Sequence, residues 1–414
     1  MGFLFFSLFI SFTAWGTIAV DQKYLETQIE SAPSILSLQE RITEAQKLSG
    51  SLRRSFLPKM KLIYGQERFT TGPLHRVNQP FGGIEAEVNL FNFGRDSLED
   101  KRRSKEAQLA QVNSKITKAE ILAKGREALA QYAYLNEISS ILREAMLMNE
   151  KNISGAEKRI RAGLSTSTDL IDFQHQKIAL NQEYETLKFE IGLVERLLAV
   201  ILGHNPDQEV IVKFQNEHPE HGPLFNAPGE FLNSALIKKA ELTLEIASLN
   251  KSKVSRWWGP RLDLYGYALR FTQKEREYPE PGQRNDVTFG FRFTLPFFDG
   301  GEAIAETQAS SARTRALEYD FRQRILEVKN ETGNALRKLD LAHNLIHGAE
   351  DSVKLMSEYR KGIMNEYTKG VKNSPDVLQA NQRWIEAKTK FAEVKRNYQF
   401  AKSEAQYLIS LSGG

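Results

Sequence analysis

The chain has 414 residues, of which 41% are hydrophobic and 26% are charged, a balance typical of folded proteins. Its formal net charge of +4 is small for this length and argues against a dedicated nucleic-acid-binding protein. The absence of cysteine excludes thiol catalysis, cysteine-ligated zinc, a disulfide framework and an N-terminal lipid-modified cysteine.

Apolar residues dominate the chain up to Val20, and no charged residue precedes Asp21. Such a run is too short for a stable spanning helix and fits the hydrophobic region of a secretory signal peptide. Small residues in Thr17-Ile18-Ala19 suit a cleavage site, with Ala14-Trp15-Gly16 as a second option, so we expect a signal peptide over residues 1–19. No basic residue precedes the apolar run, and an N-terminal anchor helix is the alternative. No later stretch is apolar for the roughly 18 residues that a spanning helix needs, so any further membrane crossing is predicted to use β-strands.

Several phrases occur twice along the chain, in the same order. FNFGR and FDGGE place Gly94 and Gly301 207 residues apart (301 − 94). RAGLSTSTDL and TKGVKNSPDVL place Gly163 and Gly370 the same 207 residues apart (370 − 163). A third pair, FLPKMKLIYG and WGPRLDLYGY, precedes both. Three matching phrases in one order predict an internal duplication.

The predicted first repeat covers residues 20–202 and the second covers residues 231–414. Between them, residues 203–230 are rich in Pro, Gly and His and are predicted to form a linker. Each repeat is expected to open with a helix, over residues 34–54 in the first and 231–256 in the second.

Two strands are expected to follow the opening helix of each repeat. Their predicted bounds are about 57–69, 82–93, 259–272 and 286–298. Apolar and polar residues alternate strictly over residues 84–90 and 287–295, so each strand has one apolar and one polar face. A soluble sandwich gives the same alternation, but an aromatic-rich apolar face over about ten residues is typical of a transmembrane barrel.

Polar side chains on these strands are expected to face the inside of the barrel. They are Glu85, Glu87, Asp263 and Arg292. Four strands do not suffice to close a barrel, because the smallest barrels use about eight and an open sheet leaves polar backbone groups in lipid. The strand count therefore predicts that several copies of the chain assemble.

Very long helices are expected after the strands. No proline interrupts residues 94–161 or 301–369, and a helix of about 65 residues extends about 100 Å. In the second repeat, small and large residues alternate at spacings of four and three, as in a coiled-coil seam: Ala335, Leu339, Ala342, Ile346, Ala349, Val353 and Met356. A shorter seam in the first repeat consists of Leu135, Ile138, Leu142 and Ala145.

The duplicated glycine phrase is predicted to form the turn between each long helix and a returning helix. Gly163 and Gly370 are suited to the left-handed conformation that ends a helix. Asp169 and Asp376 precede renewed apolar periodicity and suit the first turn of the next helix. The sequence thus predicts two long helical hairpins attached to membrane strands.

These features together resemble the TolC family of outer-membrane efflux and secretion channels. The resemblance covers nearly the whole mature chain and includes the duplication, LFNFGR and LPFFDGG at the strand-to-helix junctions, and GLSTSTDL and GVKNSPDVLQA at the hairpin tips. It implies an α+β membrane protein, a homotrimer whose chains each give four strands to a twelve-stranded β-barrel. A long α-helical coiled-coil tunnel continues the barrel into the periplasm of a Gram-negative bacterium. It implies contact with outer-membrane lipid, no nucleic acid and no cofactor.

The resemblance also implies a passive exit duct in a tripartite efflux or type I secretion system. The tip docks on a periplasmic adaptor (membrane fusion protein) that links it to an inner-membrane pump. The tip residues that match the adaptor-contacting element are Gly163, Leu164, Gly370 and Val371.

A periplasmic gate follows the tip by the same resemblance. The family pattern has two acidic rings one helical turn apart; here Asp376 matches the first, and Gln379 occupies the second. Three copies of Asp376 are expected to favour cations. The family's latch matches Lys372, Tyr367 and Asp169, with Lys in place of an Arg, so a bidentate contact is lost. Plain helix capping is the alternative role for all of these residues.

Nothing in the sequence indicates an enzyme. His343 and His347 have a metal-compatible spacing but flank seam positions, so a solvated helix face is the preferred interpretation and no metal site is predicted. The alternative to a channel is a non-conducting coiled-coil protein that tethers or spans the cell envelope.

Overall fold

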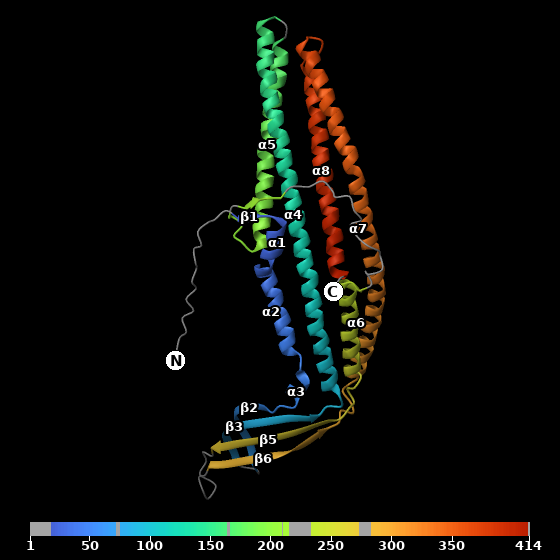
Figure 1. Ribbon diagram of the computed structural model, residues 1–414. Coiled ribbons are helices and arrows are strands. Elements are labelled where there is room, and N and C mark those ends of the chain that lie inside the picture. Colours follow the sequence, from blue (N-terminus) through green and yellow to red (C-terminus); the bar gives the residue numbers. More distant parts are fainter. Residues whose placement is uncertain are drawn as a thin grey trace. The chain divides into compact units, whose positions relative to one another are not determined.

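A computed structural model describes residues 18–71, 75–163, 166–208, 210–214, 233–272 and 283–412 (Figure 1). The chain divides into two compact units. The helical unit comprises Met1–Leu38, Lys115–Ala235 and Glu327–Gly414. The sheet unit comprises Gln39–Ser114 and Leu236–Leu326.

Four antiparallel strands form the sheet of the sheet unit (Figure 1). They are β2 (Lys59–Thr71), β3 (His75–Phe91), β5 (Arg261–Thr272) and β6 (Gln283–Thr294). Their order in the sheet is β2-β3-β5-β6, so the two hairpins of the duplicated sequence join through β3 and β5. The outer strands, β2 and β6, each have one unpaired edge within the chain.

One face of this sheet is apolar and exposed. The register places Ala86 opposite both Met60 and Gly266, and Gly266 opposite Phe289, so apolar residues of all four strands share that face. Phe289 is 81% exposed and Leu62 is 86% exposed. A broad aromatic face that the chain itself leaves uncovered is what lipid contact requires.

The helix expected over residues 34–54 is interrupted near its end. Helix α2 (Pro33–Leu48) stops before Gly50, which has a left-handed φ of 69°, and α3 (Ser51–Ser55) follows. The Arg54 guanidinium donates hydrogen bonds of 2.7 Å to the carbonyl oxygens of Leu48 and Ser49. Gly50 thus ends the helix because it adopts φ > 0 without strain, and Arg54 satisfies carbonyls at the break.

A sharp turn leads from β3 into α4 (Arg95–Arg161). Phe93 and Gly94 have positive φ values of 49° and 71°. The Phe93 ring packs edge-on against Trp258 at a centroid distance of 4.7 Å. A Cβ atom on Gly259 would lie 2.0 Å from the ring, so only glycine permits this packing.

The equivalent turn of the second repeat leads from β6 into α7 (Glu302–Thr368) and also relies on positive φ. Gly300 and Gly301 have φ values of 74° and 87°. Asp299 caps the helix, because its carboxylate accepts hydrogen bonds from the backbone N–H groups of Gly301 at 3.1 Å and Ala303 at 2.8 Å. Gly94 and Gly301, the duplicated pair, therefore share a backbone conformation.

The helical unit contains the hairpins and several short elements (Figure 1). Its remaining elements are α1 (Gln22–Gln28), η1 (Ile29–Ser31), α5 (Ser167–Leu202), α8 (Ser374–Ser412), β1 (Ile18–Val20) and β4 (Val210–Val212). In the second repeat of the sheet unit, α6 (Ala235–Val254) forms the opening helix. Of the helices that the structure describes, none has the length and apolar character needed to cross a membrane.

Interlocking helix faces, rather than a globular core, bury the apolar residues of the helical unit. One cluster joins α4, α5 and α8 and includes Leu142, Leu187 and Trp384. Another joins α7 to α8 through Ala342, Ile346 and neighbouring residues. Most of the predicted seam residues are buried: Ala335, Leu339, Ala342, Ile346, Leu135, Ile138, Leu142 and Ala145. The last three of the second seam, Ala349, Val353 and Met356, are only partly buried. Alternating small and large side chains allow the helices to approach closely.

A short parallel pairing occupies part of the segment expected to be a linker. Ile18–Val20 pairs with Val210–Val212, a run of β-branched residues. Val20 and Val210 pack against Leu198 on α5. Residues 1–17 of the expected signal peptide lie outside the described residues, and its last two residues belong to β1.

A carboxylate with three cationic partners lies near the start of α4. Glu99 contacts Arg102 at 2.7 Å, Arg103 at 2.8 Å and Lys253 of α6 at 3.0 Å. Hydrogen bonding to Arg102, and next to Arg103 and Lys253, holds the pKa of the Glu99 carboxyl far below its usual range despite burial. The charged form of Glu99 therefore stabilises the packing of α6 against α4.

Replacement Glu99→Gln is expected to lower the free energy of unfolding at pH 7 by about 2 kcal/mol, because three cations lose their carboxylate partner. A lowered folded-state pKa gives stability that is complete above the unfolded pKa of about 4.3 and declines as the pH falls below it. Thermal unfolding followed by circular dichroism should thus show a difference in stability between wild type and variant, and this difference should become smaller below that pH. The control Glu106→Gln, which removes a more exposed partner of Arg102 alone, should cost at most about 1 kcal/mol. A difference in stability between wild type and Glu99→Gln that does not depend on pH would contradict this role of Glu99.

Candidate functional site at the hairpin tips

Each long hairpin of the helical unit turns at a glycine in the left-handed conformation. Gly163 (φ 71°) and Gly370 (φ 76°) end α4 and α7. The N–H of Gly370 donates to the Tyr367 carbonyl, and the N–H of Val371 donates to the Glu366 carbonyl, both at 3.0 Å. This pattern closes a helix end, and it leaves the Val371 side chain 71% exposed at the tip. Leu164 lies outside the described residues.

Asp376 lies in the first turn of α8 and forms a reciprocal cap with Asn373. Its carboxylate accepts from the Asn373 N–H at 3.3 Å, while the Asn373 side chain accepts from the Asp376 N–H at 3.4 Å. Lys372 Nζ lies 3.7 Å from the Asp376 carboxylate. Gln379 follows one helical turn later and is exposed. Capping therefore orients Asp376 without burying it.

A hydroxyl group joins the two hairpins beside this cap. Ser374, fully buried at the start of α8, donates to the Asp169 carboxylate and lies 3.1 Å from Asp172 of the same helix, α5. Sequence reasoning missed Ser374, because a serine in a first helical turn normally indicates capping and its partners come from the other repeat. The Asp169 carboxylate is thus engaged across the hairpins.

A second contact between the hairpins involves Arg159 and Tyr367. The Arg159 guanidinium lies 4.4 Å from the Tyr367 ring centroid and donates to the Tyr367 carbonyl oxygen at the end of α7. The Tyr367 side chain is buried, and its hydroxyl finds no hydrogen-bond partner within the described chain. Burial raises the Tyr367 pKa, Arg159 opposes the rise, and Asp169 adds to it.

Apolar packing surrounds these polar contacts. Phe173 of α5 is fully buried, and its ring meets that of Tyr367 edge-on at 6.3 Å. Ile363, Val377 and Ala380 complete a cluster to which all four hairpin helices contribute. The buried Asn149 side chain donates to the Phe173 carbonyl at 2.8 Å. The tips of the two hairpins are therefore packed together within one chain.

The latch expected from the sequence is arranged differently in the isolated chain. Lys372 lies near Asp376 rather than reaching the first repeat through a hydrogen bond, and Asp169 receives Ser374. Tyr367 faces Arg159 and feels the charge of Asp169 without bonding to it. The reason is geometric: Lys372 and Asp376 are one helical turn apart, and Tyr367 is buried against Phe173.

The four residues expected in a barrel lumen lie in the sheet unit on the polar face. Arg261 bridges Glu87 at 3.0 Å and Asp263 at 2.7 Å. Arg292 lies directly across from Asp263 in the register and stacks over the Tyr265 ring at 4.7 Å. Glu85 lies opposite Lys61 and Tyr267 on the same face. Sequence reasoning missed Arg261, which occupies the first position of its strand.

The two histidines of α7, His343 and His347, lie close to one another. Their rings lie 6.2 Å apart, and His343 also lies 6.2 Å from Tyr398 of α8. Among the residues that the structure describes, no group of three or more His, Cys, Asp or Glu side chains is placed to hold a metal ion.

A protein-family model with the description "Outer membrane efflux protein" matches residues 231–413. This match covers 183 residues (413 − 231 + 1), which is less than half of the chain. The matched residues include β5, β6, both helices of the second hairpin and the tip with Asp376. No curated protein matches the sequence of the chain.

Solved structures share the fold over nearly the whole chain. The outer membrane protein VceC from Vibrio cholerae is 17% identical, with a TM-score of 0.76 over 95% of this chain and 96% of that one. The Campylobacter jejuni CmeC outer membrane channel is 13% identical, with a TM-score of 0.81 over 97% and 90%. The open state of the Neisseria gonorrhoeae MtrE outer membrane channel is 16% identical, with a TM-score of 0.74 over 95% and 89%.

The resemblance to TolC-like channels is therefore confirmed at the level of the fold, in which one chain supplies four strands and long helical hairpins. The family model that the second half of the chain matches supports the predicted location in the Gram-negative outer membrane and a role in efflux.

Replacement Ser374→Ala is expected to weaken the contact between the hairpins by about 1–2 kcal/mol, since two carboxylates lose a buried donor. Hydrogen exchange should then be about tenfold faster in the first turns of α5 and α8. The control Ser167→Ala alters an exposed residue at the start of α5 and should leave exchange unchanged. Equal exchange in Ser374→Ala and wild type would contradict the joining role of Ser374.

Proposed function

We propose that the chain is the passive exit duct of a tripartite efflux system or a type I secretion system. The observation that carries this proposal is the arrangement of the second tip, where an exposed turn at Val371 is followed within one turn of α8 by the capped Asp376. An exposed apolar tip suits a docking partner, and a carboxylate just behind it suits control of passage.

Docking is assigned to the glycine turns. Gly163, Leu164, Gly370 and Val371 form the surface that meets a periplasmic adaptor, which in turn contacts an inner-membrane pump. The positive φ values of Gly163 and Gly370 support this role, because they allow a tight turn that a residue with a Cβ adopts only with strain.

Gating is assigned to Asp376. Copies related by three-fold symmetry bring three carboxylates into one ring, which attracts cations and repels anions. Gln379 adds no charge one turn further along, so the ring acts alone. Lys372 partly neutralises each carboxylate. Opening requires separation of the two hairpins, so the contacts of Ser374 and of Arg159 with Tyr367 oppose it.

Glu85, Glu87, Asp263 and Arg292 are assigned to the lumen of the barrel. The ion pairs of Glu87 and Asp263 with Arg261 support this assignment, as does the position of all four residues on the face opposite the apolar one. Because positive and negative side chains both occur on that face, selectivity between cations and anions is assigned to the tip rather than to the strands.

Purified protein in a planar bilayer is expected to conduct and to prefer cations. Asp376→Asn should reduce the preference because the ring loses its charge, whereas Asp351→Asn, an exposed residue of α7, should not. Absence of conductance, even in Asp376→Ala, would reject the duct in favour of a structural tether. Conductance with unaltered selectivity would reject only the role of Asp376.

Val371→Asp is expected to abolish the ability of the protein to restore efflux to a deletion strain, because a charge at the tip opposes apolar docking. The compounds to test are those among drugs, metal ions and secreted proteins to which the deletion is sensitive. Val371→Leu keeps an apolar side chain and should restore efflux. Bilayer conductance should be unchanged in both variants, and full efflux by Val371→Asp would contradict docking through this residue.

A further inference from the structure

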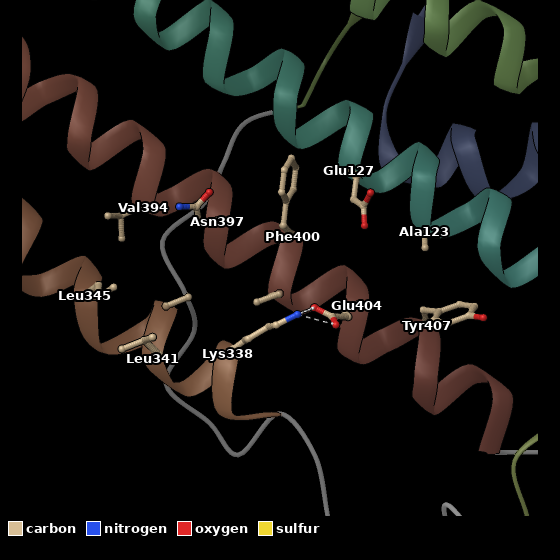
Figure 2. A pocket seen from close by; sticks show the side chains of 12 residues that line it. Ala123, Glu127, Lys338, Leu341, Leu345, Val394, Asn397, Phe400, Glu404 and Tyr407 are labelled. Atoms are coloured by element: carbon tan, nitrogen blue, oxygen red, sulfur yellow. Dashed lines mark hydrogen bonds and ion pairs between the residues drawn. The ribbon is translucent and has the colours of Figure 1, made fainter. Parts of the chain in front are cut away.

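A groove runs along α8 where it packs between α4 and α7 of the helical unit (Figure 2). Its volume is about 530 Å³, within the usual range for small-molecule sites. Apolar side chains make up most of its lining and include Leu341 and Leu345 of α7 and Val394, Phe400 and Ala401 of α8. Leu341 and Leu345 are 59% and 51% exposed, so apolar surface remains uncovered within the chain.

A carboxylate that makes no ion-pair contact with the described residues lies in this apolar groove. Glu127 enters it from α4 (Figure 2) and forms no hydrogen bond or ion pair with any residue that the structure describes. Burial raises the pKa of Glu127, the nearby Glu404 carboxylate adds to the rise, and Lys124 opposes it. The ionised side chain is therefore disfavoured unless a positive charge approaches it.

The other charges of the groove neutralise one another. Lys338 Nζ lies 3.0 Å from both carboxylate oxygens of Glu404, as the dashed lines in Figure 2 indicate. Tyr407 points its hydroxyl toward Glu120 at 3.5 Å. One net negative charge thus remains on the groove, at Glu127.

We propose that this groove binds a hydrophobic organic cation, whose apolar body packs on Leu341, Leu345 and Phe400 while its charge meets Glu127. A small metal ion would gain too few oxygen ligands here, an organic anion would be repelled by Glu127, and a neutral compound would leave the carboxylate unpaired. The first residue of the site on α8, Val394, lies 20 residues (394 − 374) from Ser374, or about 30 Å of helix. The site is separate from the tip and does not depend on the proposed gate.

The test uses the full-length trimer in lipid nanodiscs and equilibrium dialysis against tetraphenylphosphonium. Tetraphenylborate has nearly the same shape and the opposite charge, and empty nanodiscs correct for uptake by lipid. Wild type is expected to bind the phosphonium and not the borate. Glu127→Gln keeps the shape of the side chain and should weaken phosphonium binding roughly tenfold or more. The control Glu157→Gln makes the same change at an exposed residue of α4 outside the groove and should bind as wild type.

A gain-of-affinity variant keeps the test decisive if Glu127→Gln does not assemble. Lys338→Met releases Glu404 from its ion pair, so a second carboxylate faces the groove and phosphonium binding should strengthen severalfold. Equal binding of the phosphonium and the borate would show adventitious uptake only and would overturn the proposal. Phosphonium binding that neither Glu127→Gln nor Lys338→Met alters would overturn it in the same way. Absence of phosphonium binding to the trimer would overturn it as well, since a neighbouring copy would then cover the groove.

Discussion

Backbone hydrogen bonds at the edges of the four-stranded sheet are the constraint on which the rest of the structure depends. Strands β3 and β5 pair on both sides, whereas β2 and β6 each leave one edge open within the chain. Hydrocarbon supplies no water to satisfy the backbone groups at those edges, so insertion into a membrane requires strands of other copies to pair with them. The exposed aromatic face around Phe289 follows from the same constraint, because a closed barrel presents that face to lipid and the polar face to its lumen.

The helical unit is subject to a different constraint. Its long helices must bury their apolar faces, and no globular core is available to cover them. Along the interface of α7 and α8, alanine alternates with larger residues, as at Ala342 and Ile346. This alternation lets each helix bury the apolar side chains of the other. Such packing covers only one stripe of each helix. Where three helices meet with side chains of unequal length, a groove remains, and in this protein an unpaired Glu127 occupies it. The proposed cation site thus arises from the packing geometry of long helices.

At the tips, side chains of the first turn of α8 take part both in capping their own helix and in contacts with the other hairpin. Asp376 caps α8 together with Asn373, and the proposed gate gives the same carboxylate a second role in a charged ring. Ser374, its neighbour but one, joins the hairpins through Asp169. Each of these contacts contributes only about 1–3 kcal/mol. Modest contacts of this size hold the hairpins together, and the proposed opening by a docking partner would have to overcome only a few of them.

The sequence by itself determined the duplication, the alternating strands, the long helices with their buried seams and the left-handed glycines at the turns. These features depend on periodicity and on backbone conformation, which neighbouring residues set. Local reasoning also identified Asp376, although not its pairing with Lys372. Only the tertiary structure decided that Ser374 meets Asp169, that Arg159 stacks on Tyr367 and that Glu127 faces an apolar groove beside Glu404. Those contacts join residues from different repeats, and which side chains meet across two packed hairpins depends on the register of the helices, which local patterns do not encode.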